Sequence, residues 1–297
     1  EPYRRQRQMC IRDRVIIMIK KDGHTHTQFS HHGSTEQLDM YIERAIDLGF
    51  TEYVVTEHAP LPQQFLEEFV GPDDARDNSA MAIDELTFYK SEVERVKEKF
   101  KDKINIKSGF EVDYLKVYET DIRSFLQRES NWIDEIVLSV HFLPNNEGNV
   151  APIDYEPDTL SAYFSDECRN PQILFKRYYD EVIQSVNFDT GLKVPVRIGH
   201  ITLIRKYQKL LHLPKFDESI KQQITELLAI IKQKNYQLDF NAAGFSKPYN
   251  GESYPTFDIA EQAKKIGIGL VYGSDAHEVN ALGLYYDEMK ELIVDKK

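Results

Sequence analysis

The sequence has few cysteines and no long apolar run, and both absences narrow the class of protein. Its two cysteines, Cys10 and Cys168, stand far apart and form no Cys-x-x-Cys pair. Neither a disulfide framework nor a thiolate zinc site is therefore expected. No apolar stretch approaches the roughly 20 residues that span a bilayer, so we expect no membrane insertion and a cytoplasmic location.

Positive charge is also scarce. The 37 Lys and Arg residues are outnumbered by 49 Asp and Glu residues, which gives 297 residues a formal net charge of -12. Proteins that bind nucleic acids normally gather basic side chains, so no nucleic-acid partner is expected. A small anion can still bind where metal ions and a few local arginines make the electrostatic potential inside a pocket positive. The sequence carries no signal of the oligomeric state.

The first 17 residues differ from the rest in composition. They are rich in arginine and lack the apolar core and small-residue cleavage site of a secretory signal. We interpret residues 1–17 as a disordered or non-native extension, with Met18 as a start just ahead of the first strand. Residues 18–297 are expected to form a single domain, because barrel folds reach roughly 250 residues as one unit.

Short β-branched runs alternate with longer stretches of helical period, a pattern typical of βα units around a parallel sheet. Strands are expected over residues 15–20, 53–56, 104–109, 135–140, 196–199, 237–240 and 268–273. Helices are expected over residues 34–48, 83–100, 121–127, 172–185, 218–233, 256–266 and 287–294. Seven strands with intervening helices predict an α/β fold with a closed or nearly closed barrel.

Two local signals refine this pattern. In the clearest helix, over residues 34–48, Ser34 and Gln37 are spaced as a capping box and Gly49 follows as a stop. The segments 60–81 and 142–170 are too long for plain connections. Both follow a strand and a histidine, so we expect them to overhang one rim of the barrel as binding loops.

Most of the nine histidines, together with three acidic residues, follow predicted strands directly. In chain order these residues are His24 and His26, His58, Glu111 and Asp113, His141, His200, and Asp275 with His277. The carboxyl ends of parallel barrel strands share one face, where barrel enzymes build their sites. A single histidine in such a place is more often structural. The number of these placements instead favours a multinuclear metal site, because imidazoles and carboxylates are ligands for zinc, iron and manganese.

Several longer motifs run in a fixed order along the chain. They are His-Thr-His-Thr from residue 24, Glu-His-Ala-Pro-Leu from 57, Gly-Phe-Glu-Val-Asp from 109, Ser-Val-His-Phe-Leu from 139, Gly-His-Ile-Thr-Leu-Ile-Arg-Lys-Tyr from 199 and Ser-Asp-Ala-His from 274. This series resembles the PHP (polymerase and histidinol phosphatase) superfamily, and within it the histidinol-phosphate phosphatase branch. The resemblance covers the chain from Lys20 to the last helix.

The resemblance implies a distorted (β/α)7 TIM-like barrel that holds three divalent metal ions, zinc, iron or manganese, at the carboxyl ends of its strands. By motif matching, the first ion would be held by His24, His26, Glu111 and Asp275, the second by Glu111, His141 and His200, and the third by His32, His58 and His277. Among them Glu111, Asp275 and His26 are the expected catalytic residues. No ligand position of the pattern is missing.

The activity implied is that of a phosphoric monoester hydrolase, acting on L-histidinol phosphate in histidine biosynthesis by attack of a metal-bridging hydroxide on phosphorus. Guanidinium groups match phosphate geometry, so we predict that Arg177 and Arg205 bind the phosphate. Arg177 could instead be a solvated charge on a helix. Asp113 is predicted either to contact the substrate ammonium group or to orient a ligand histidine.

Two other functions stay open at this point. A PHP-type nuclease or nucleotide phosphatase would be expected to carry a basic groove beside the site, against the negative charge found here. A metal-binding regulatory barrel without catalysis would be expected to have lost ligands or to have a filled pocket.

Overall fold

The protein, seen here in a computed structural model that describes residues 19–293, is built around one seven-stranded parallel sheet in the order β1-β2-β3-β4-β7-β8-β9. Its strands are β1 (Lys21–Asp22), β2 (Glu52–His58), β3 (Asn105–Asp113), β4 (Glu135–Ser139), β7 (Val196–Ile198), β8 (Gln237–Asn241) and β9 (Leu270–Gly273). The predicted seven-stranded α/β barrel is confirmed. The predicted extension over residues 1–17, the start at Met18 and most of the strand expected over residues 15–20 lie outside the described residues.

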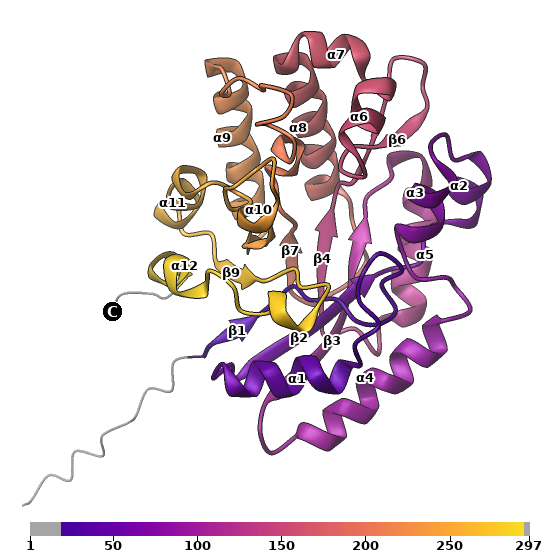
Figure 1. Ribbon diagram of the computed structural model, residues 1–297, viewed down its shortest axis with the longest axis vertical. Helices are drawn as coiled ribbons and strands as arrows, with labels where there is room; N and C mark the ends of the chain where they lie inside the picture. The colour runs from indigo at the N-terminus through magenta and orange to yellow at the C-terminus, as the bar shows by residue number, and fades with distance from the viewer. Residues whose placement is uncertain (1–18, 294–297) are drawn as a thin grey trace, which may run out of the picture.

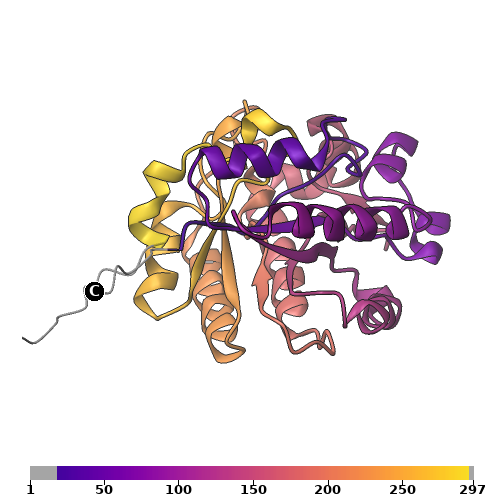
Figure 2. The same ribbon diagram turned by 90° about the horizontal axis from the view of Figure 1, so that it is seen from below.

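The two edge strands of this sheet meet. The Gly23 N–H donates a hydrogen bond to the Tyr272 carbonyl at 2.8 Å, and Thr25 pairs in parallel with Ala276 just beyond the two strands. As a result the segments that follow β1 and β9 lie next to each other, with the strands at the centre and helices outside them (Figure 2). The barrel is therefore nearly closed, and its strand ends face a common rim.

Helices cover the outside of the barrel (Figure 1). The longer ones are α1 (Leu38–Asp47), α4 (Leu86–Phe100), α5 (Glu119–Glu129), α8 (Pro171–Asn187), α9 (Glu218–Gln233), α11 (Phe257–Lys265) and α12 (Tyr286–Ile293). All seven predicted helices are present, with ends that shift by a few residues. Within residues 19–293, no helix is both long and apolar enough to cross a bilayer.

The start of α1 differs from the prediction. The helix begins at Leu38, four residues after Ser34, and Gln37 makes no side-chain cap. The Leu38 N–H instead donates to the side-chain oxygen of Gln28 at 3.1 Å, while the Ser34 hydroxyl donates to a Glu36 carboxylate at 2.8 Å. The predicted capping box is wrong because a residue from the preceding loop supplies the acceptor. The predicted stop at Gly49 is confirmed by its φ of +76°.

Both long segments reach the rim of the barrel, as predicted, but they contain short elements of their own. The first holds α2 (Gln63–Glu68) and α3 (Asp73–Asn78), and the second holds the hairpin β5 (Phe142–Pro144) and β6 (Val150–Pro152) followed by α6 (Pro157–Tyr163) and α7 (Ser165–Arg169). The remaining short elements are η1 (Lys116–Tyr118), η2 (Leu203–Arg205), α10 (Ala243–Ser246) and η3 (Val279–Ala281). Several of the segments that connect strands and helices thus surround the space above the carboxyl ends of the strands.

An ion network closes the opposite, amino-terminal end of the barrel. Glu135, the first residue of β4, is 1% exposed and receives Lys21 and Lys107 at 2.6 Å each. The fully buried Arg197 of β7 also pairs with Glu135, and its guanidinium donates to the Gly23 carbonyl. Glu52 completes the network at 2.9 Å from Lys21. We call these five side chains, Lys21, Glu52, Lys107, Glu135 and Arg197, the floor network.

Candidate metal centre

The structure brings together the nine side chains predicted as metal ligands. They come from the carboxyl ends of six strands: His24, His26 and His32 after β1, His58 from β2, Glu111 from β3, His141 after β4, His200 after β7, and Asp275 with His277 after β9. Residues separated by about 250 positions in the sequence therefore meet at one rim. Parallel strands make this convergence possible, because each strand delivers its last residues to the same face.

Glu111 lies at the centre of this cluster and is 1% exposed. One of its carboxylate oxygens is 2.9 Å from Nε2 of His200 and 3.6 Å from Nε2 of His141. The other oxygen is 3.1 Å from Nε2 of His24 and 3.2 Å from Nδ1 of His58. The two oxygens thus face different sets of imidazoles, which is the arrangement that a carboxylate bridging two cations requires.

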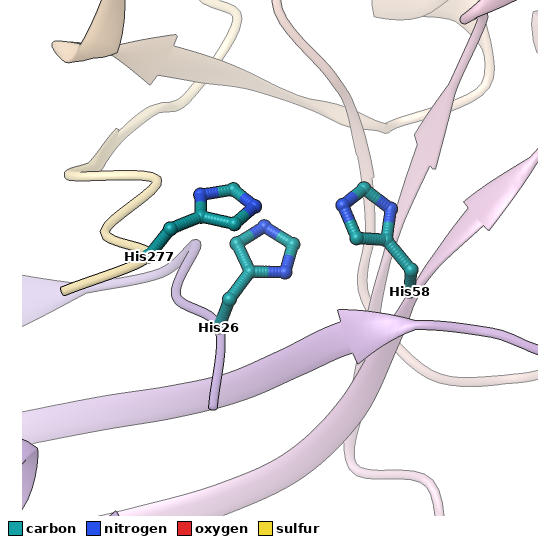
Figure 3. Close-up of side chains that lie close together, drawn as sticks. All are labelled: His26, His58 and His277. Atoms are coloured by element: carbon teal, nitrogen blue, oxygen red, sulfur yellow. The ribbon is translucent and has the colours of Figure 1, made fainter. Parts of the chain in front are cut away.

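A second part of the cluster is made of stacked imidazoles. His26 packs against His277 with ring centroids 4.0 Å apart and against His58 with centroids 4.4 Å apart (Figure 3). Nε2 of His58 and Nε2 of His277 are buried without a hydrogen-bond partner among the described residues. His32 lies beside them, 4.5 Å from the His277 ring. Buried nitrogens without partners are rare, and a cation is a partner that fits this donor set.

The ligand atoms fall into three overlapping groups. Atoms within each group lie within 4.8 Å of one another, and the groups are His24 with His26 and Glu111, His58 with Glu111 and His141, and His26 with His58 and His277. The first group matches part of the expected first ion. His26 also belongs to the group of His58 and His277, which the motif pattern assigned to a separate ion. The boundaries between the expected ion sites are thus less sharp than the pattern implied.

Three buried carboxylates hold the Nδ1 atoms of three of these imidazoles. The pairs are Asp239 with His24 at 2.7 Å, Glu57 with His26 at 3.1 Å and Asp113 with His141 at 2.7 Å. Such bonds fix the tautomer and aim Nε2 toward the centre. Asp113 therefore orients a histidine, one of its two predicted roles. Glu57, which directly precedes His58, and Asp239, which lies within β8, are orienting carboxylates that the sequence pattern did not predict.

Charge within the cluster perturbs its titrating groups strongly. Burial raises the pKa of Glu111, but the neighbouring charges of His24, His58 and His141 hold it well below its usual value. Burial lowers the pKa of His141, while the charges of Asp113 and Glu111 raise it overall to about 10. Without cations His141 therefore keeps its proton, whereas burial lowers the pKa values of His58 and His277 well below their usual range. A metal ion would replace the proton on His141, since only deprotonated groups act as ligands.

Asp275 has a strained backbone. Its φ is +53°, a left-handed conformation that is uncommon for residues other than glycine. The conformation is held by the hydrogen bond from the Asp275 N–H to the His24 carbonyl at 2.8 Å, and Asn241 donates to the Asp275 carboxylate at 3.1 Å. This turn aims the carboxylate at Nε2 of His26, 3.0 Å away.

The cluster opens into a cavity of about 320 Å³, which suits a small ligand. Its lining includes seven of the nine predicted ligands, together with Asp154, Lys206, Lys247 and Tyr254. Lys206 is held by Asp154, whose carboxylate lies 3.1 Å from its Nζ. The cavity is thus lined both by predicted metal ligands and by two lysines.

The structure does not bring the two predicted phosphate-binding arginines into this lining. Arg177 donates to the Pro144 carbonyl at 2.6 Å and pairs with the buried Glu167 at 2.7 Å. It therefore ties α8 to the β5–β6 hairpin and to α7, and it is not the solvated charge that was considered as its alternative. Arg205 donates to the Pro214 carbonyl at 2.7 Å, and its guanidinium lies 5.0 Å from the centre of the Phe216 ring.

We expect that Asp239→Asn lowers activity and metal affinity about 10- to 100-fold, the usual effect of losing a partner that orients a ligand histidine. An asparagine keeps the shape of Asp239 but places a neutral amide against Nδ1 of His24. Metal titration followed by phosphate release measures the effect. Asp102→Asn, a change of the same chemistry at an exposed residue near the other end of the barrel, is the control. Equal metal affinity in the two variants would contradict the role of Asp239.

Comparison with known proteins identifies the family to which this chain is similar. A family model for the PHP domain matches residues 22–243. The histidinol-phosphatase of Bacillus subtilis is 35% identical over 274 residues, which cover 92% of this chain and 99% of that protein.

Solved structures give the same picture. The crystal structure of HisK from Listeria monocytogenes has a TM-score of 0.86 at 36% identity and covers 91% of this chain and 99% of its own. Histidinol phosphate phosphatase from Lactococcus lactis, crystallised with zinc, L-histidinol and phosphate, has a TM-score of 0.67 at 21% identity and covers 92% of each chain. The chain belongs to the PHP domain family, among its histidinol-phosphatases.

Proposed function

We propose that this enzyme hydrolyses L-histidinol phosphate to L-histidinol and phosphate, with residues 18–297 acting as one catalytic unit. The observation that carries the proposal is the central Glu111, whose two oxygens face two separate sets of imidazoles beside a cavity of small-molecule size. A non-catalytic metal-binding barrel would need neither an open cavity nor a complete ligand set. The histidinol-phosphatase from Bacillus subtilis, alike over nearly its whole length, supports the choice of substrate.

The ligand set fits three divalent ions, and we propose that they are zinc, iron or manganese. The zinc in the Lactococcus lactis structure supports the first of these. When bound, such ions make water a stronger nucleophile near neutral pH and neutralise charge on the phosphoryl group and the leaving oxygen. We propose that His24, His26, Glu111 and Asp275 hold the first ion, Glu111, His141 and His200 the second, and His32, His58 and His277 the third.

The protein's own side chains supply orientation. Asp113, Glu57 and Asp239 fix three imidazoles, so the ligand atoms are in place before substrate arrives. This arrangement lowers the cost of reorganising the site during reaction. The walls of the cavity, including Pro152 and Tyr155 from the segment after β4, limit the space to a small phosphomonoester.

Phosphate release from a panel of small phosphomonoesters tests the proposal. The panel includes L-histidinol phosphate, nucleoside monophosphates and p-nitrophenyl phosphate, with the metal content measured on the same sample. We expect kcat/KM to be highest for L-histidinol phosphate by at least about a hundredfold, because buried polar contacts reject analogues that lack the matching groups. If kcat/KM were instead about a hundredfold higher for a nucleoside monophosphate, the substrate assignment would change to that of a nucleotide phosphatase.

A further inference from the structure

Tyr254 lines the cavity without belonging to the cluster of imidazoles and carboxylates. Its side chain is 2% exposed, and its hydroxyl has no hydrogen-bond partner among the residues that the structure describes. A buried phenol without a partner costs stability, and a bound water, ion or ligand is one explanation for such a group in a native protein. Burial raises the pKa of Tyr254 well above its usual value, so the hydroxyl keeps its proton and can donate.

Lys247 lines the same cavity from the segment after α10. Among residues 19–293 no carboxylate forms an ion pair with it, whereas Lys206, the other lysine of the lining, is held by Asp154. Lys247 is an exposed residue, so its ammonium group is a solvated cation that an incoming anion can neutralise.

Both residues lie in the segment that follows β8, and Asn241, the last residue of β8, holds this segment beside the predicted metal ligands. Tyr254 exchanges two backbone hydrogen bonds with Asn241, at 2.7 and 2.9 Å, and the Asn241 amide donates to Asp275. The Asn241 side-chain oxygen also accepts a hydrogen bond from the Ala243 N–H at the start of α10, the short helix that Lys247 directly follows. Asn241 thus connects Tyr254, Lys247 and a predicted metal ligand in one short framework.

The charge of the lining indicates which end of the substrate meets these donors. Besides the histidines, the lining contains four acidic residues, Glu111, Asp113, Asp154 and Asp275, but only two basic ones, Lys206 and Lys247. A phosphate dianion entering this space needs donors that no acidic group already occupies. We propose that the Tyr254 hydroxyl and the Lys247 ammonium group donate hydrogen bonds to the phosphoryl oxygens of the substrate, a role that rests on the proposed phosphatase function.

Two substitutions test this assignment. Tyr254→Phe removes only the hydroxyl, and Lys247→Met removes the charge while keeping an unbranched side chain. Their matched controls are Tyr249→Phe and Lys215→Met, at exposed residues outside the cavity lining. The probes are inorganic phosphate and L-histidinol, each measured as an inhibitor of p-nitrophenyl phosphate hydrolysis and, independently of turnover, by calorimetric titration of the metal-loaded enzyme.

We expect each variant to bind inorganic phosphate about tenfold or more weakly, because hydrogen bonds to charged groups are strong. Binding of L-histidinol and the metal content should stay unchanged. Tyr254→Phe should unfold at the same midpoint as the wild type or a higher one, since it removes a buried group without a partner.

A variant that binds phosphate as tightly as its control overturns the role of that residue. A loss confined to L-histidinol overturns the assignment to the phosphoryl end. Failure of the wild type to hydrolyse L-histidinol phosphate would instead refute the proposed substrate, and the titration with inorganic phosphate would still give its answer.

Discussion

Glutamine in place of Glu111 is expected to abolish phosphate release and to empty the site of metal. The substitution keeps the shape of the side chain but removes the charge between five imidazoles, and an amide offers a single oxygen where two now face separate histidines. We expect kcat/KM to fall by at least about a thousandfold, the upper range for removal of one essential electrostatic group.

Elemental analysis of the purified variant, together with phosphate release from L-histidinol phosphate, measures the effect. His31→Ala is the control, because His31 adjoins the predicted ligand His32 in sequence but binds Glu85 and the Asp77 carbonyl outside the cluster. The control should keep both metal and activity. A Glu111→Gln variant with nearly normal turnover would contradict the proposed centre.

Glu135→Gln is expected to lower the free energy of unfolding by about 3–5 kcal/mol. Glu135 is the shared acceptor of the floor network, and its loss leaves the fully buried Arg197 without a counter-charge. Breaking one partner of a buried ion pair is costly because the remaining charge stays desolvated. Urea unfolding of the metal-free protein measures the change as a shift of the midpoint. A variant as stable as the wild type would show that the network contributes nothing.

The stability that the Glu135 carboxylate contributes should decrease as the pH falls. Burial raises the pKa of Glu135, but Arg197 and Lys21 lower it overall from 4.5 to about 2. A carboxylate whose pKa is lower in the folded state contributes its stability fully above pH 4.5 and loses it as the pH falls toward 2. The difference between wild type and Glu135→Gln should therefore be constant above about pH 5.5 and shrink below pH 4.5. A difference that grows on acidification would contradict this linkage.

Glu52→Gln provides the matched control for this experiment. Glu52 contacts the same two lysines, Lys21 and Lys107, but it is partly exposed and does not contact Arg197. Solvent screens such a pair, so we expect a loss below about 1 kcal/mol. The contrast between the two glutamates separates the buried part of the network from its exposed part.

The barrel and the composition of its reaction centre were largely predictable from the sequence. Period-2 and period-3.6 patterns separate strands from helices, and parallel strands bring their carboxyl ends to one face. The positions of His58, Glu111 and His200 at the ends of three different predicted strands therefore predicted a common site. Their distances from one another depend on the twist of the barrel, which the sequence pattern does not contain.

The cations of the cavity were not predictable in this way. Arg205 was expected to face the phosphate, but it turns toward Pro214 and Phe216, while the next residue, Lys206, lines the cavity. Arg205 is the last residue of η2 and Lys206 follows it, and in such a helical turn a shift of one position rotates a side chain to another face. The direction is decided by the neighbouring loops, and residue type alone does not reveal it.

The meeting of β1 with β9 also has a consequence for the order of events during synthesis. His24 leaves the ribosome early, whereas Asp275 and His277 belong to the last strand region, so the proposed set of metal ligands cannot be assembled until nearly the whole polypeptide has emerged. We therefore expect any metal loading to follow the completion of translation, and a chain cut short before residue 275 would lack two of the nine predicted ligands.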